Sequence, residues 1–171
     1  HGYLARRIGS RTHLLRSLLT QAINVASVGQ GAAYADRCAK IEDLKARVPS
    51  ELSHAQVAYG LAVAATYRAD WAAGHRGLLE ARRRFGQLPE VQPEVGWGGA
   101  LLVYVCHQLG RLREARRWLA QSVIDSDARG DLWSQIVVRT GMANALWLTS
   151  GEDRKAQAAL EEAERLCRER Q

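Results

Sequence analysis

Histidine and cysteine are the residues of this chain that could supply a nucleophile, a base or metal ligands. Cys106 and His107 are adjacent, but neighbouring residues on a helix point about 100° apart, so they do not form a nucleophile and its base. His13, His54 and His75 have no second histidine at the i, i+4 spacing of a helical metal site. We therefore expect no catalytic residue, no metal site and no cofactor in this segment.

Two glycine-containing motifs resemble functional sites at first sight. The run GWGG, residues 96–99, lacks the Lys and the Ser or Thr of a phosphate-binding loop. Its glycines are expected to let a helix start close to its neighbour. Arg129, Gly130 and Asp131 spell an adhesion tripeptide, but we interpret them as a turn, in which Gly130 ends one helix in the left-handed conformation and Asp131 caps the next.

Arginine supplies most of the positive charge in a chain of net charge +6, since there are only three lysines, Lys40, Lys45 and Lys155. Arginine clusters within residues 82–84, 111–117 and 165–170 could attract nucleic acid or a phosphorylated peptide. Glutamates are interleaved with them at 80, 114, 161, 162, 164 and 169. Pairing at helical spacing favours solvated helix faces, so nucleic acid is the less favoured partner.

Every element expected to position these residues is a helix. Hydrophobic periodicity predicts helices at about 11–28, 31–47, 51–68, 70–86, 94–109, 111–128, 131–149 and 153–170. Ser10, Thr12, Ser50, Asp70, Asp131 and Asp153 are placed near helix starts, where they can cap. Leu88, Pro89, Gln92 and Pro93 form the longest linker, and the segment from Gly86 to Trp97 is a candidate bend or binding loop.

A repeat of about 40 residues organises these helices. Small or turn-forming residues recur at Gly29, Ala69, Gly110 and Gly151, with gaps of 40, 41 and 41 residues. Positions five, nine and twelve residues after each of them share a character and one helix face: Tyr34, Cys38 and Ile41; Gly74, Leu78 and Ala81; Ala115, Leu119 and Ser122; Ala156, Leu160 and Ala163. Because a helix pair cannot bury its apolar stripe alone, such copies are expected to stack into a solenoid.

The segments GLAVAATYRADWAAGHRGLLEA, LLVYVCHQLGRLREARRWLAQS and ANALWLTSGEDRKAQAALEEA resemble tetratricopeptide repeats. The resemblance implies an all-α, right-handed superhelix of about four antiparallel helix pairs, with repeats at about 11–47, 51–86, 94–128 and 131–170 in a single domain over residues 1–171. The spacing near 40 departs from the 34 residues of that family, which puts a carboxylate-clamp groove in doubt. Residues 109–148 are also similar to long repeats C-terminal to bacterial serine/threonine kinases and to those of maltose-activator-type regulators.

Three cysteines far apart in sequence, Cys38, Cys106 and Cys167, indicate reduced thiols packed in a core, and hence a cytoplasmic protein. No apolar run is long enough for a membrane span. The absence of a starting Met, with a last helix that ends abruptly, indicates a fragment of a larger protein, which could carry a kinase domain elsewhere.

The five tryptophans include the candidate partner-binding residues. Trp71 and Trp147 fall at positions expected in the core. Trp97 and Trp133 lie near the starts of first helices, which line the concave surface in the architecture implied by the resemblance. These two residues are therefore our candidates for partner contact, and Arg139 is named as a third.

The sequence as a whole predicts a non-catalytic protein-interaction or regulatory module, with a protein or peptide partner. The open ends of a solenoid also leave room for a homodimer. A basic nucleic-acid platform, or the repeat domain of a transcriptional regulator, is the alternative.

Overall fold

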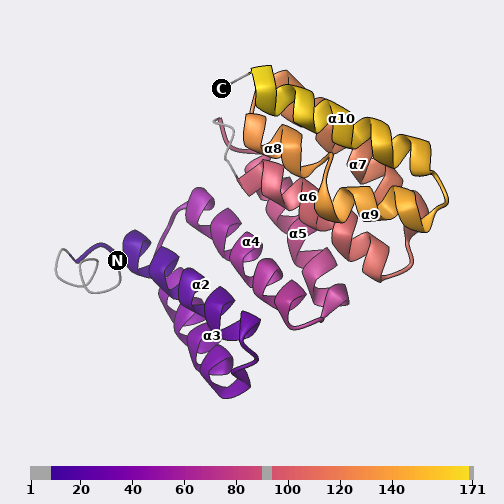
Figure 1. Ribbon diagram of the computed structural model, residues 1–171. Helices are drawn as coiled ribbons and strands as arrows, with labels where there is room; N and C mark the ends of the chain where they lie inside the picture. Colours follow the sequence, from indigo (N-terminus) through magenta and orange to yellow (C-terminus); the bar gives the residue numbers. More distant parts are fainter. Residues whose placement is uncertain (1–8, 90–93, 170–171) are drawn as a thin grey trace. The chain divides into compact units, whose positions relative to one another are not determined.

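The computed structural model describes residues 9–89 and 94–169, except the side chains of residues 142 and 143. Every regular element in these ranges is a helix (Figure 1). The helices are α2 (Arg11–Ser27), α3 (Gly31–Lys45), α4 (Glu51–Tyr67), α5 (Trp71–Phe85), α6 (Glu94–Gln108), α7 (Leu112–Arg129), α8 (Leu132–Val137), α9 (Gly141–Thr149) and α10 (Asp153–Glu169). The all-α class is therefore confirmed for the described residues. None of these helices is long and apolar enough to cross a membrane.

The predicted helix starts are confirmed where a polar side chain caps the backbone. Ser10, Ser50, Asp70 and Asp131 each accept a hydrogen bond from the backbone N–H three residues further on. Each bond satisfies one of the donors that the first turn of a helix leaves unpaired. Gly130 has φ +63° and ends α7, so the turn interpretation of residues 129–131 is confirmed.

The single helix predicted over residues 131–149 is wrong, because the chain breaks between α8 and α9. Thr140 is extended, with ψ −179°, and Gly141 has φ +50°. Side chains accommodate the break: Thr140 Oγ1 donates to the carbonyl of Ile136 at 2.9 Å, and Asn144 Nδ2 donates to the carbonyl of Arg139 at 3.3 Å. Hydrophobic periodicity continues across the break, which is why the pattern did not reveal it.

The four repeat anchors share one backbone conformation. Gly29, Ala69, Gly110 and Gly151 have φ between +58° and +74°, in the left-handed region. Each of them lies in the turn between two helices. Ala69 is the non-glycine residue with positive φ among the described residues, and its Cβ makes that conformation unfavourable.

Replacing Ala69 with Gly is therefore expected to stabilise residues 1–94. Relief of the left-handed strain stabilises the fold by about 1 kcal/mol. Glycine also has more freedom in the unfolded chain, which offsets part of this gain, so the expected net stabilisation is about 0.5 kcal/mol. Chemical denaturation followed by far-ultraviolet circular dichroism measures the change. An Ala73→Gly variant, on the first turn of α5, is the control and should lose stability. A loss of stability in Ala69→Gly would contradict the strain argument.

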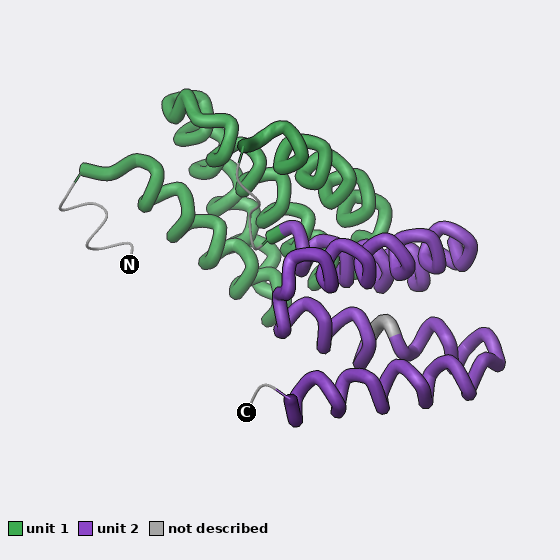
Figure 2. Tube along the Cα trace, turned by 90° about the horizontal axis from the view of Figure 1, so that it is seen from above, with its two compact units in different colours: residues 1–94 green, residues 95–171 purple. Residues whose placement is uncertain are grey.

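The described chain divides into two compact units, residues 1–94 and 95–171 (Figure 2). The core of the first unit contains Leu15, Leu18, Leu19, Ala22, Ile41 and Val57. The core of the second contains Ala100, Val103, Cys106, Ala115, Leu119, Val138 and Leu146. The division follows the predicted linker, of which Gln92 and Pro93 lie outside the described residues, so the single-domain interpretation stays a prediction.

Helices that follow one another pack together, α2 with α3, α4 with α5, and α9 with α10. Most repeat-stripe residues of the second helices are buried as predicted: Ile41, Gly74, Leu78, Ala81, Ala115, Leu119, Ser122, Ala156 and Ala163. The predicted burial of Leu160 is wrong, because this residue is 39% exposed whereas its counterparts Leu78 and Leu119 are buried. Cys38 and Cys167 are only half-buried, so the prediction of core-packed thiols holds for Cys106 alone.

Candidate partner-binding surface

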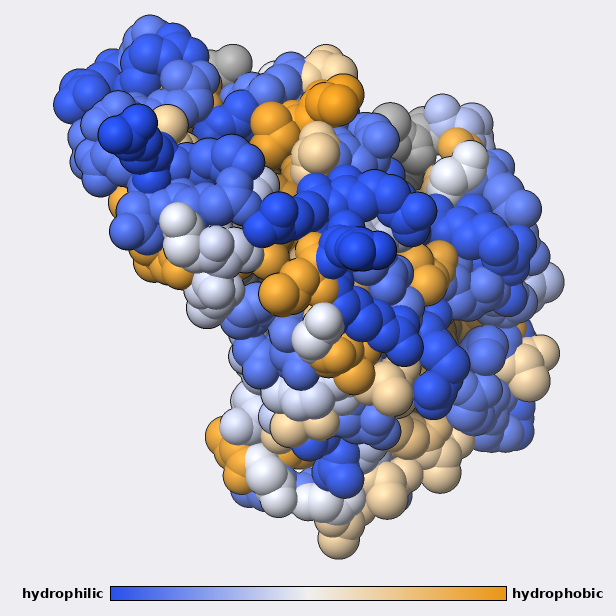
Figure 3. Space-filling model, turned by 90° about the vertical axis from the view of Figure 1, so that its right-hand side faces the viewer, coloured by the Kyte–Doolittle hydropathy of each residue, from blue (hydrophilic) through white to orange (hydrophobic). Residues whose placement is uncertain are grey.

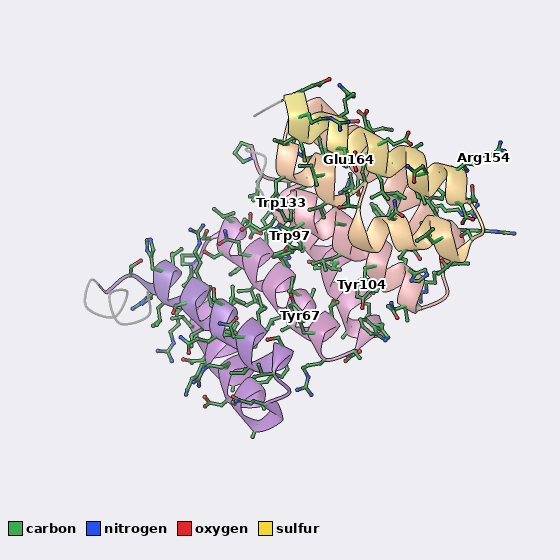
Figure 4. The ribbon with its side chains drawn as sticks, in the orientation of Figure 1. Tyr67, Trp97, Tyr104, Trp133, Arg154 and Glu164 are labelled. Atoms are coloured by element: carbon green, nitrogen blue, oxygen red, sulfur yellow. The ribbon has the colours of Figure 1, made fainter. Side chains whose placement is uncertain are left out.

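The structure brings together two of the three candidate residues within the second unit. Trp97 lies on the first turn of α6 and Trp133 on the first turn of α8 (Figure 4). Their ring centroids are 4.3 Å apart and the ring planes are inclined by 35°. Trp97 is 41% exposed and Trp133 is 45% exposed. The pair thus presents two stacked indoles that keep much of their apolar surface in contact with solvent.

A close helix contact beside the two rings sets their position. A Cβ added at Gly96 would lie 2.1 Å from Ser134 Oγ, so the absence of a side chain at residue 96 lets α6 approach α8 this closely. Trp97 follows Gly96 and Trp133 precedes Ser134, so the contact carries the two indoles into stacking distance. This confirms that glycine in the GWGG run allows a close helix approach.

The N-terminal cap of α8 fixes the same turn. Asp131 accepts hydrogen bonds from the backbone N–H of Ser134 at 3.2 Å and from its hydroxyl. The hydroxyl hydrogen bond lowers the pKa of the Asp131 carboxyl below its ordinary value. Trp133 is therefore held on a capped helix turn and not on a loose loop.

Arg139, the third candidate, lies inside the second unit and is 8% exposed. Its Nη2 donates to Asp127 Oδ2 at 2.6 Å, and its Nη1 donates to the carbonyl of Gln135 at 3.1 Å. Gln135 Nε2 also donates to Asp127, at 3.0 Å. These bonds tie α7 to the end of α8, so the guanidinium is engaged within the fold and forms no part of the tryptophan surface.

Trp147 is half-buried and faces cations of the same unit. Lys155 Nζ lies 5.0 Å from the centre of its ring and the guanidinium carbon of Arg116 lies 5.9 Å away, both within cation–π range. Glu152 forms ion pairs with both cations. Trp147 also packs against the core of this unit without being fully buried, so its predicted core position is confirmed only in part.

Most of the interleaved glutamates pair with the arginine clusters, as the spacing predicted, whereas Glu161 accepts a hydrogen bond from Gln157. Ion pairs join Arg83 and Arg84 to Glu80, Arg111 to Glu114, Arg165 to Glu162 and Glu169, and Arg168 to Glu164. Hydrogen bonds from Arg83 and then Arg84 lower the pKa of Glu80 to about 2. The upper part of the face drawn in Figure 3 is mostly hydrophilic, with apolar residues between polar ones, and the lower part is paler and more apolar.

Cys106 and His107 have the separate surroundings that their adjacency on one helix predicted. Burial raises the pKa of the Cys106 thiol to about 12, so the thiolate that a nucleophile needs is strongly disfavoured. The ring Nε2 of His107 lies 3.0 Å from Thr149 Oγ1 and takes part in a hydrogen bond there.

The first unit contains a hollow that sequence reasoning missed. It has a volume of about 530 Å³ and is lined by α2 and α4, with Leu19 and Gly60 among its residues. Arg16 Nε donates to Gln56 Oε1 at 3.0 Å, and Gln56 Nε2 donates to Glu94 Oε1 at 3.0 Å. Arg16 and Gln56 are 40 residues apart, so the repeat spacing itself was the signal that could have paired them.

Comparisons with family models, with curated proteins and with solved structures find no match for this chain.

Proposed function

We propose that this chain is a non-catalytic protein-docking module whose partner binds at the Trp97–Trp133 pair. The observation that carries the proposal is the stacking of two half-exposed indoles on capped or closely packed helix turns. Tryptophan is enriched at the energetic centres of interfaces, because it offers a large apolar area and a polar N–H. Side chains already held by a rigid fold lose little further entropy on binding.

The raised pKa of Cys106 argues against this thiol as a nucleophile. The recurrence of a left-handed residue at the four anchors supports a repeated helix–turn–helix unit. The tetratricopeptide-type right-handed superhelix rests on the sequence resemblance. The three free cysteines support a cytoplasmic protein. A place in a multidomain bacterial signalling protein, such as a serine/threonine kinase, belongs to the same proposal and rests on the sequence resemblance.

The test compares partner capture by the intact chain and by variants of the pair. We expect Trp97→Ala and Trp133→Ala each to reduce capture of the same bound protein by about tenfold, because each removes an interface anchor. Quantitative mass spectrometry of proteins retained from a bacterial lysate provides the measurement. Tyr67→Ala, which truncates an exposed aromatic residue of the first unit, is the matched control and should capture normally. Unchanged capture by both tryptophan variants would remove the proposal.

The nucleic-acid alternative has less support, because the arginine clusters are largely paired with glutamates. Binding of a labelled single-stranded DNA that weakens steeply with salt would favour it, since phosphate contacts release counterions. Docking through apolar indoles is expected to depend only weakly on salt.

A further inference from the structure

The second helices α7 and α10 are related by the 41-residue spacing, and they differ at one informative position. The glycines before them, Gly110 and Gly151, have φ +69° and +68°. Five residues after each glycine, Ala115 and Ala156 are both buried. Nine residues after, Leu119 is 3% exposed whereas Leu160 is 39% exposed. The middle position of the stripe is therefore covered on α7 and partly exposed on α10, while its neighbours on the stripe are buried in both helices.

Residues of α8 and α9 cover Leu119 on α7. Leu119 packs in a cluster with Val138 from the end of α8 and Leu146 from α9. Further along α7, Asp127 accepts hydrogen bonds from Gln135 and Arg139. The cover thus consists of an aliphatic residue at the end of α8, Val138, followed directly by a charged residue, Arg139, that meets the charge on α7, and of Leu146 on α9.

The matching place beside α10 is an apolar hollow of about 320 Å³. Ile136 and Thr140 line one side of it, and Leu160, Ala163 and Cys167 line the side that α10 provides. Glu164, labelled on α10 in Figure 4, and Arg168 line it as well. A hollow of this kind, continuous with an exposed leucine, is suited to receive aliphatic side chains.

The position on α10 that matches Asp127 of α7 carries the opposite charge. Position 168, 41 residues after Asp127, is arginine. Arg168 and Glu164 form a loose pair of 3.7 Å in which both side chains are about 70% exposed, a type of pair that contributes little. In the covered helix, Arg139 lies beside Asp127. A segment that lies beside Arg168 in the same way therefore needs an acidic residue at the position that Arg139 occupies.

We propose that the hollow between α8 and α10 binds a helical segment of a partner protein in which an aliphatic residue is followed directly by an acidic residue. The proposal rests on the docking function above and gives the partner a chemical class. It concerns a second surface, so its failure and the failure of the tryptophan surface can be told apart.

The probe is a labelled synthetic peptide with the sequence of residues 131–150, because that segment fills the equivalent place on α7. One version carries Arg139→Glu and the other keeps the natural arginine. Fluorescence anisotropy with the full chain is expected to show the Arg139→Glu peptide binding about fivefold more tightly, since an attractive pair with Arg168 replaces a repulsive one. Equal affinities, or no binding of either peptide, would overturn the proposal.

Variants of the full chain locate the binding. Leu160→Asp is expected to weaken binding of the Arg139→Glu peptide by about tenfold, because it puts a charge in the apolar hollow. Ile124→Asp alters a more exposed aliphatic residue on α7 and should leave the affinity unchanged. Arg168→Glu should reverse the preference between the two peptides. Far-ultraviolet circular dichroism verifies that each variant is folded, and a folded Leu160→Asp chain with undiminished affinity would refute the site.

Two further measurements separate the alternatives. The Trp97→Ala and Trp133→Ala variants should bind the peptide normally. If they lose capture of the lysate protein but still bind the peptide, the tryptophan surface and the hollow are separate binding sites. Sedimentation of the full chain at increasing concentration tests for a second copy as the occupant. A dimer that Leu160→Asp abolishes would assign the hollow to that copy and overturn the proposal.

Discussion

Asp127→Ala is expected to destabilise residues 95–171 by about 3 kcal/mol, because it leaves the nearly buried guanidinium of Arg139 without its carboxylate. The variant also removes the acceptor of the Gln135 side chain. Trp fluorescence during chemical denaturation is a suitable measurement, since Trp97, Trp118, Trp133 and Trp147 all lie in this unit.

The reverse change separates the loss of the ion pair from the cost of a stranded charge. Arg139→Met is expected to cost only about 1 kcal/mol, because the Asp127 side chain is 43% exposed and water can solvate it. A chain that carries both Asp127→Ala and Arg139→Met should be more stable than one that carries Asp127→Ala alone. Glu164→Ala, which breaks an exposed pair, is the control and should change stability by less than about 0.5 kcal/mol. If Arg139→Met proved as costly as Asp127→Ala, the stranded-charge explanation would be wrong.

The sequence predicted those features of the fold that local interactions determine. Apolar spacing placed the helices, and Ser10, Ser50, Asp70 and Asp131 marked their starts, because a cap needs only residues three positions apart. The glutamates that pair with arginine are likewise three or four residues away. These features depend little on the rest of the fold.

The features that the sequence did not predict depend on residues that are distant in the chain. The break before Gly141 is accompanied by bonds between Arg139 and Asp127 on another helix. Leu160 fits the apolar stripe by type, yet its burial depends on whether another element covers α10. Trp97 and Trp133 were selected one by one, but their contact across 36 positions needed the folded chain.

Gly99→Ala is expected to destabilise the second unit by about 2 kcal/mol. A Cβ at this position would lie 2.4 Å from Ser122 Oγ and 3.2 Å from Ser122 Cβ, so α6 and α7 must move apart or Ser122 must change rotamer. The net cost is smaller than the packing cost itself, because alanine has a higher helix propensity than glycine by about 1 kcal/mol. Chemical denaturation followed by Trp fluorescence measures the difference.

Ser122→Ala provides the control, because it removes the atom that the new methyl group would meet. Ser122 Oγ is buried and makes no hydrogen bond within the described part of the chain, so its removal alone should leave stability unchanged or slightly higher. In the Ser122→Ala background, Gly99→Ala should cost less than about 0.5 kcal/mol, since the remaining 3.2 Å contact needs only a small adjustment. The two substitutions are then coupled by about 1.5 kcal/mol, which is typical of residues in direct contact. Additive effects would show that the intolerance at residue 99 does not arise from Ser122, and that the close approach of α6 to α7 has another cause.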